Sequence, residues 1–121
     1  VIVTAASTPE TRHLLDGAAF DRMFPGAHVV NVARGPLVDQ EALITALDRG
    51  QVARASLDVV DPEPLPAGHP LYAHPKVRIS PHVSWSSPET TSRTVELFAE
   101  NLRRFRNGEP LQGTVDVAAG Y

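Results

Sequence analysis

Short runs of β-branched and apolar residues alternate along this chain with stretches in which apolar side chains recur at helical spacing. The short runs predict strands at 1–5, 28–32, 52–57 and 77–79. The other stretches predict a short helix from Asp16 to about Met23, a second that begins after Asp39, and a long one from Glu89 to about Asn107. Strands and helices in alternation indicate an α/β fold built on a parallel sheet.

Capping residues support these helices. Asp16 and Asp39 are expected N-caps, because a short carboxylate can accept hydrogen bonds from the first free amides of a helix. Gly50 and Gly108 are expected to end the second and third helices, since glycine readily adopts the left-handed backbone of a helix end.

Two segments are predicted to lie outside helices and strands, and the structure of a third is left open. Residues 7–11 are typical of a loop. The proline-rich segment 62–70 is too rigid and too poor in amide donors for a helix or an inner strand. For the tail from 115 to 121, the sequence predicts no particular structure.

The long helix has an apolar stripe made of Val95, Leu97, Phe98, Leu102 and Phe105. By default such a stripe packs into a core. If the surface that it packs against is missing, exposed apolar area of this size favours dimerisation or aggregation. A homo-oligomer is therefore expected.

Composition and charge are those of an ordinary soluble globular domain, with 42% apolar and 21% charged residues among 121. A net charge of -3 without a basic run argues against nucleic acid or an anionic membrane as partner. The absence of cysteine excludes disulfides and thiolate chemistry and makes an intracellular, cytoplasmic location the default. There is no signal-peptide pattern and no apolar run near the ~20 residues of a membrane-spanning helix.

Three residues that can carry chemistry follow predicted strands. Arg34 lies in the segment 31–35 after the second strand, Glu63 follows the third after a few loop residues, and His82 comes directly after the fourth. In an open α/β sheet, ligands bind at the edge formed by the carboxyl ends of the strands. We therefore expect these side chains to converge on one cleft.

Their chemistry suits the interconversion of a 2-keto acid and a 2-hydroxy acid. The guanidinium of Arg34 can bind a substrate carboxylate through two hydrogen bonds and polarise the neighbouring carbonyl. His82 can exchange a proton near neutral pH, and Glu63 can fix its tautomer. Since no side chain supplies a hydride, a nicotinamide cofactor is implied, and Asp58 could accept a hydrogen bond from its amide.

Each candidate also has an ordinary structural explanation. Arg34 alone is typical of a surface arginine, Glu63 alone of a solvated loop, and a Pro-His pair alone of a loop histidine that bonds a carbonyl. Their joint occurrence, each near a strand end, favours the catalytic interpretation. No metal site is predicted, because His69, His74 and His82 lack the helical spacing of metal ligands.

The segments with these residues resemble the D-isomer-specific 2-hydroxyacid dehydrogenases. That family has an Asn-x-Ala-Arg-Gly, an Asp-Val-x-x-x-Glu-Pro and a Pro-His segment, matched here in the same order at 31–35, 58–64 and 81–82. The resemblance extends over nearly the whole chain. The ending from Gly113 to Tyr121 is similar to the glyoxylate/hydroxypyruvate reductase branch, which favours glyoxylate and hydroxypyruvate as substrates.

The resemblance implies an oxidoreductase that uses NAD or NADP on a small 2-keto or 2-hydroxy acid. Arg34 would bind the substrate, His82 would donate the proton, and Glu63 would orient His82. The nicotinamide side would be lined by Val32, Ala33, Arg34, Asp58, His82, Val83, Ser84 and Trp85. The chain departs from the family at Ala6, usually proline, and at Ser84-Trp85, usually small residues. Trp85 is equally compatible with a pocket wall and a cover over the core.

One element of such enzymes is absent. No Gly-x-Gly occurs among the eight glycines, so the turn that would hold the pyrophosphate is missing, together with the acidic residue that would read the adenosine ribose. The chain opens on Val1, within a predicted buried strand, which indicates lost upstream sequence. We expect 1–88 to be a partial Rossmann-like parallel sheet, the second half of an NAD(P)-binding domain, and 89–121 to be a long carboxyl-terminal helix and tail that return to a missing substrate domain.

The isolated chain is therefore expected to be inactive or nearly so. Two other interpretations fit the same residues: a dehydrogenase-like regulatory or corepressor module that binds the cofactor as a signal, and a proteolytic remnant without a role of its own. The choice between NAD and NADP stays open, because the discriminating residues would lie upstream.

Overall fold

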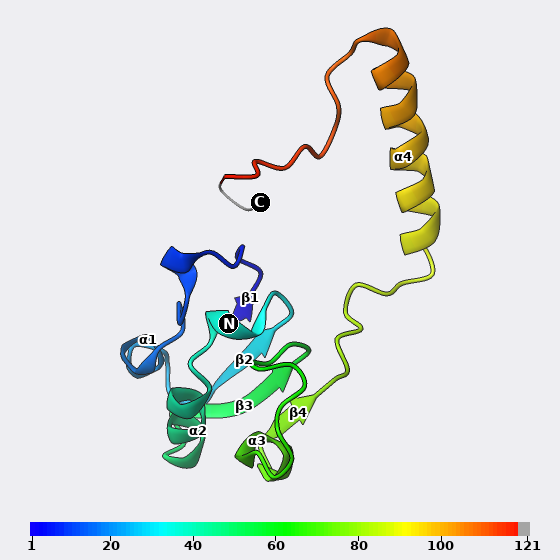
Figure 1. The fold of residues 1–121 in the computed structure, drawn as a ribbon. Coiled ribbons are helices and arrows are strands. Elements are labelled where there is room, and N and C mark those ends of the chain that lie inside the picture. The colour runs from blue at the N-terminus through cyan, green and yellow to red at the C-terminus, as the bar shows by residue number, and fades with distance from the viewer. Residues whose placement is uncertain (119–121) are drawn as a thin grey trace. The chain divides into compact units, whose positions relative to one another are not determined.

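The computed structural model describes residues 1–118, which form two compact units (Figure 1). The first, Val1–Val83, contains the strands and the shorter helices, and the second begins at Ser84 and contains the long helix. Residues 119–121 of the predicted tail lie outside the described range.

A parallel sheet forms the centre of the first unit. Its strands lie side by side in chain order: β1 (Ile2–Val3), β2 (Ala27–Asn31), β3 (Val52–Leu57) and β4 (Val77–Ile79). The predicted α/β fold with a parallel sheet is confirmed.

The predicted boundaries hold for β3 and β4 and shift for the other two strands. β1 covers residues 2 and 3 rather than 1–5, because only these pair with Val30 and Asn31 of β2. β2 covers 27–31 rather than 28–32, since the chain leaves the ladder where the Asn31 side chain starts a turn.

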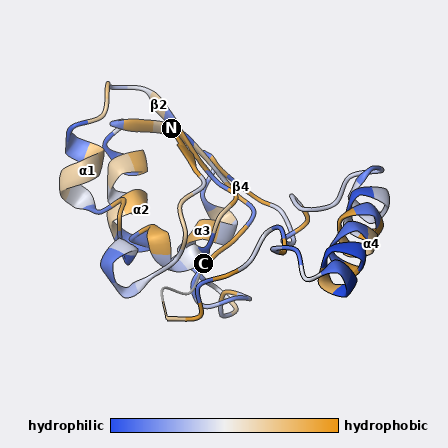
Figure 2. Ribbon diagram, turned by 90° about the horizontal axis from the view of Figure 1, so that it is seen from above, coloured by the Kyte–Doolittle hydropathy of each residue, from blue (hydrophilic) through white to orange (hydrophobic). Residues whose placement is uncertain are grey.

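Two helices lie on the same side of the sheet (Figure 2): α1 (Gly17–Asp21) and α2 (Gln40–Asp48). Both predicted N-caps are confirmed. The Asp16 carboxylate accepts a hydrogen bond from an amide in the first turn at 2.8 Å, and the Asp39 carboxylate does so at 3.0 Å. α1 ends at Asp21 rather than near Met23, because the amide of Arg22 already bonds the carbonyls of the last turn.

Alternation along the strands gives the sheet two different faces. The face under the helices is apolar, and the core there includes Phe20, Val29, Leu43, Leu47, Ala55, Leu57, Leu71 and Val77. The opposite face carries exposed His28, Arg54 and Arg78. Only the first face is thus a packed layer within the described residues.

A short helix, α3 (Pro70–Ala73), begins at the last proline of the segment predicted to be non-helical. That prediction is wrong at Pro70, because proline at the first helical position lacks only an amide that would be unpaired anyway. His69 Nδ1 accepts the Leu71 amide at 3.3 Å, and Leu71 enters the core. The predicted loop 7–11 also contains a 3₁₀ turn at Pro9–Thr11.

The second unit contains α4 (Thr90–Asn107), which ends as predicted at Gly108, with a left-handed φ of 69°. Its predicted core stripe is exposed instead, from 45% at Leu97 to 73% at Phe105. The expectation of core packing fails here because the described part of this unit has no other helix or strand to pack against. Among the helices of residues 1–118, none combines the length and the apolar composition of a membrane-spanning segment.

Charged side chains form a network at the carboxyl end of α4. Arg103 bonds Glu100 at 2.9 Å and Glu109 at 2.8 Å, and Arg104 bonds Glu100 at 2.7 Å. The hydrogen bond from Arg103 lowers the pKa of Glu100 to about 2, and the same guanidinium lowers the pKa of Glu109 to about 2. Arg103 therefore joins the last turn of the helix to the segment after it.

Replacing Arg103 by serine is expected to raise the pKa of both Glu100 and Glu109 towards 4.5, because it removes the largest cause of each shift. A carboxyl-carbon NMR titration of the chain measures both values. Since the folded pKa is lowered, the stabilisation is present above pH 4.5 and is lost as the pH falls towards about 2. Arg106→Ser is the control, since the ion pairs described at this helix end involve Arg103 and Arg104 and not Arg106. Unchanged midpoints in Arg103→Ser would contradict the network.

Candidate active site

Three strands of the first unit end at one edge of the sheet. Their last residues are register partners across the sheet: Asn31, Leu57 and Ile79. Because the strands are parallel, the segments that follow them emerge together. These segments bring Arg34, Asp58 and His82 to the same edge.

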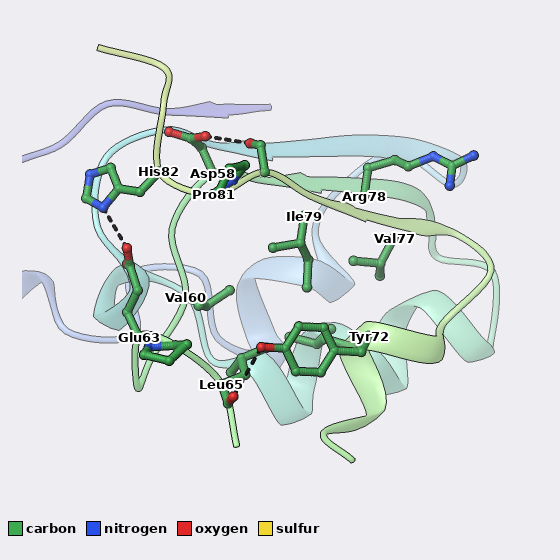
Figure 3. A pocket seen from close by; sticks show the side chains of 13 residues that line it. Asp58, Val60, Glu63, Leu65, Tyr72, Val77, Arg78, Ile79, Pro81 and His82 are labelled. Carbon is green, nitrogen blue, oxygen red and sulfur yellow. Dashed lines mark hydrogen bonds and ion pairs between the residues drawn. The ribbon is translucent and has the colours of Figure 1, made fainter. Parts of the chain in front are cut away.

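His82 and Glu63 are in direct contact at this edge. Imidazole Nδ1 lies 2.7 Å from carboxylate Oε1 (Figure 3). An ionised carboxylate only accepts hydrogen bonds, so the proton of this bond belongs to Nδ1. The side chains are 39% and 40% exposed, and an ion pair so exposed contributes at most ~1 kcal/mol. The backbone must therefore place both groups.

The backbone at His82 is held in an uncommon conformation. Its φ of 54° is left-handed, which costs a non-glycine residue on the order of 1–3 kcal/mol. The Asp58 carboxylate holds the loop on both sides, because Oδ1 accepts the Ser80 hydroxyl at 2.5 Å and the Val83 amide at 3.0 Å. Asp58 is 5% exposed, so these bonds form away from water.

Asp58 therefore has a structural role that the sequence did not reveal. The sequence predicts it as an acceptor for a nicotinamide amide, and its contacts here fix the loop that carries His82. Sequence reasoning missed Ser80, although a buried acid at a strand end needs nearby donors. The need of a buried carboxylate for hydrogen-bond donors was the signal that could have identified Ser80.

Arg34 lies beyond a turn made by buried Asn31, which is 1% exposed. The Asn31 amide donates to the Arg34 carbonyl at 2.9 Å, and its oxygen accepts the Ala33 amide at 3.1 Å. The exposed guanidinium of Arg34 donates to the Ala33 carbonyl at 2.7 Å. It forms no bond to Glu63 or His82 among the described residues, so only two of the three predicted catalytic side chains are in contact.

The backbone after Arg34 packs against the loop that carries Glu63. A Cβ at Gly35 would lie 2.0 Å from the Val60 carbonyl oxygen and 2.7 Å from the Asp61 nitrogen, so only glycine fits. The Gln40 side chain also accepts the Asp61 amide at 3.1 Å and donates to the Asp61 carbonyl at 2.5 Å. Neither Gly35 nor Gln40 was predicted as part of the site.

A pocket of about 460 Å³ lies beside the His82–Glu63 pair. In Figure 3, Asp58, Glu63 and His82 occupy one end, and Tyr72 and Val77 lie towards the other. The remaining lining is mostly apolar: Val60, Pro64, Leu65, Leu71, Ile79 and Pro81. The volume is within the range of ~300–1,000 Å³ typical of small-molecule sites.

The other predicted cofactor-lining residues divide between the two units. Val32, Ala33 and Val83 belong to the first unit and follow strand ends; Val32 is 37% exposed and Val83 46%. Ser84 and Trp85 belong to the second unit. There the Trp85 carbonyl accepts the Thr90 hydroxyl at 2.9 Å, and Trp85 is 68% exposed.

The histidines considered as metal ligands each have a separate partner. His69 caps α3, His74 lies 3.2 Å from the Asp48 carboxylate, and His82 bonds Glu63. Within residues 1–118, no group of three or more histidine, aspartate or glutamate side chains is placed to hold a metal ion.

Over residues 1–84 the sequence matches the family model described as D-isomer specific 2-hydroxyacid dehydrogenase, NAD binding domain. The glyoxylate/hydroxypyruvate reductase A of Photorhabdus laumondii is 38% identical over 115 residues, which are 94% of this chain and 36% of that protein. The chain thus spans little more than a third of that relative.

Solved structures of dehydrogenases share this fold. A D-isomer specific 2-hydroxyacid dehydrogenase from Xanthobacter autotrophicus, in complex with NADPH and MES, is 43% identical with a TM-score of 0.88, over 100% of this chain and 49% of that one. An NADPH-dependent glyoxylate/hydroxypyruvate reductase from Sinorhizobium meliloti, in complex with NADP and sulfate, is 32% identical with a TM-score of 0.87, over 99% and 39%. The predicted Rossmann-like character of the sheet is confirmed.

Replacing Gly35 by alanine is expected to destabilise the chain by roughly 1–3 kcal/mol, the usual cost of an overpacked interior. The new Cβ would meet backbone atoms of Val60, which cannot rotate away. Urea unfolding measures the loss. Gly17→Ala is the matched control, because a Cβ at Gly17 meets nothing within 4 Å. Equal stabilities of the two variants would contradict the close approach.

Proposed function

This chain belongs to the D-isomer specific 2-hydroxyacid dehydrogenases, and we propose that Arg34, Glu63 and His82 are the catalytic set of an NAD(P)-dependent oxidoreductase that acts on small 2-keto and 2-hydroxy acids. The observation that carries the proposal is the 2.7 Å hydrogen bond between Glu63 and His82, at the carboxyl edge of a parallel sheet and beside a pocket. Because the relatives are longer than this chain, the activity is proposed for the whole enzyme.

His82 is the proposed proton donor in the reduction of a keto acid. With Nδ1 bonded to Glu63, Nε2 is the atom that exchanges a proton with the substrate oxygen. The carboxylate fixes the orientation and the tautomer of the ring. When the hydroxy acid is oxidised, the same nitrogen takes the proton back.

Arg34 is the proposed anchor for the substrate carboxylate. The guanidinium is exposed at the edge of the sheet, and its one partner within residues 1–118 is the Ala33 carbonyl. A substrate carboxylate offers a stronger, charge-assisted pair of hydrogen bonds. Binding there would set the keto carbon beside His82 and favour charge that develops on the carbonyl oxygen.

The residues present fit one half of a dinucleotide cofactor. Val32 and Val83 are apolar and partly exposed at the edge, where they suit a flat ring, and Asp58 is a carboxylate acceptor next to them. Val32, Ala33, Arg34, Asp58, His82, Val83, Ser84 and Trp85 are the proposed lining on the nicotinamide side. When bound, NAD(P)H supplies the hydride that no side chain can supply. The chain has no glycine-rich turn for the pyrophosphate.

Glyoxylate and hydroxypyruvate are the proposed substrates. The Photorhabdus and Sinorhizobium proteins are named for these compounds, and both cover nearly all of this chain. The pocket of about 460 Å³ has Glu63 and His82 at its polar end, and Arg34 is not among the residues that line it. Either NAD or NADP serves in this proposal.

We further propose that 1–88 is the second half of an NAD(P)-binding domain, and that 89–121 leads to a substrate domain. A cytoplasmic homo-oligomer accords with the exposed apolar stripe of α4 and with the absence of cysteine. The isolated chain is proposed to be inactive, because it spans 36% of the Photorhabdus relative.

The activity is tested with a graft in which this chain replaces the matching part of the Photorhabdus reductase. The graft is expected to oxidise NADH or NADPH with glyoxylate or hydroxypyruvate, whereas the isolated 121-residue chain shows little or no oxidation. Absorbance of the reduced cofactor follows both reactions. A graft that folds and binds cofactor but reduces neither keto acid contradicts the proposed function. Rapid turnover by the isolated chain contradicts the proposal that this chain is inactive alone.

Within the graft, His82→Ala is expected to lower kcat by about 10²–10⁴, the usual contribution of a positioned acid or base. Steady-state kinetics with glyoxylate measure the effect. His28→Ala is the control, since His28 lies on the sheet face and bonds Ser56 at 2.9 Å. A module that only senses the cofactor would instead bind cofactor and partner in both variants. It would catalyse no reaction in either variant or in the unsubstituted graft.

A further inference from the structure

Glu63 depends on the surrounding backbone for its position. Its carboxylate is 40% exposed, and water competes for the bond with His82. Prolines flank Glu63 on both sides, and neither can donate a backbone hydrogen bond. The loop must therefore be fixed at a residue outside this short run.

Asp61 is that fixed residue. Its amide donates to Gln40 Oε1 at 3.1 Å, and its carbonyl accepts Gln40 Nε2 at 2.5 Å, so one side-chain amide satisfies both backbone groups. Its carboxylate also lies 3.5 Å from Arg12. Only Pro62, whose φ is restricted by its ring, separates Asp61 from Glu63. Fixing the backbone of Asp61 therefore limits the positions that Glu63 can adopt.

The anchoring side chain comes from the segment that also carries Arg34. Gln40 is the first residue of α2, and Asp39 caps that helix. In the same segment, Gly35 touches the Val60 backbone, next to Asp61. These neighbouring contacts join the segment that carries Arg34 to the loop that carries Glu63.

We propose that Gln40 is a positioning residue: by binding both backbone groups of Asp61, it holds the Glu63 carboxylate against His82 Nδ1 and so selects the imidazole tautomer. The role deepens the proposed function and rests on it for its catalytic meaning. The physical claim, that Gln40 controls the Glu63–His82 bond, concerns the chain alone.

The test reads the tautomer of His82 in the full 121-residue chain. Chemical shifts of the two ring nitrogens distinguish Nδ1–H from Nε2–H, and they are measured at about pH 9, where an ordinary imidazole is neutral. Glu63→Ala shows which tautomer His82 adopts when the carboxylate is absent. Gln40→Ala removes both bonds to Asp61. Gln40→Glu keeps an acceptor for the Asp61 amide, loses the donor to its carbonyl, and preserves the size of the side chain.

In the wild type, His82 is expected to be mainly in the Nδ1–H tautomer. Glu63→Ala is expected to lower the share of this tautomer, and Gln40→Ala is expected to lower it by at least half as much. Gln40→Glu should fall between wild type and Gln40→Ala. Glu41→Ala is the matched control: it alters the same helical turn at an exposed residue, so it should keep the wild-type tautomer. Amide spectra of the strands confirm that each variant is folded.

A wild-type tautomer in folded Gln40→Ala overturns the proposal. If Gln40→Ala does not fold, a wild-type reading in Gln40→Glu overturns it equally. Failure of the proposed function has a different signature, because an inactive graft leaves these readings unchanged. A shifted tautomer with an inactive graft supports the positioning role and removes only its catalytic meaning.

Discussion

The parallel register of β2, β3 and β4 is the constraint on which the site depends. Because Asn31, Leu57 and Ile79 are register partners, the three segments that follow leave the sheet at one edge. In an antiparallel arrangement, neighbouring segments would emerge at opposite edges. The helices on the apolar face stabilise the sheet, since Leu43 and Leu47 of α2 are buried in one core with Val29 of β2 and Ala55 of β3.

Buried polar side chains fix the conformation of the loops that leave this edge of the sheet. Asn31 satisfies two backbone groups of the turn before Gly35, and Asp58 satisfies donors on both sides of His82. A buried polar group without partners is costly, so each of these bonds restricts the loop that provides the partner. The left-handed backbone at His82 persists because Asp58 holds the residues around it.

The two faces of the sheet differ in polarity, and so do the surfaces of α4. Parallel sheets are usually covered on both faces, and here charged and polar side chains on the second face make exposure to water acceptable. On α4 the balance is different, because large apolar side chains are exposed and a charge network orders the helix end. Relatives that are two to three times longer have further chain for contacts with such surfaces.

The local pattern could be predicted from the amino-acid sequence: two strands to the residue, the caps Asp16 and Asp39, the end of α4 at Gly108, and the three segments that resemble the family. Periodicity and capping are readable because they depend on neighbours along the chain. The bond from the Val83 amide to Asp58 and the bond from Gln40 to the Asp61 carbonyl could not be predicted in this way and are seen in the folded chain. Those bonds join residues distant in sequence, and the choice of partner depends on burial and strand register, which no local pattern records.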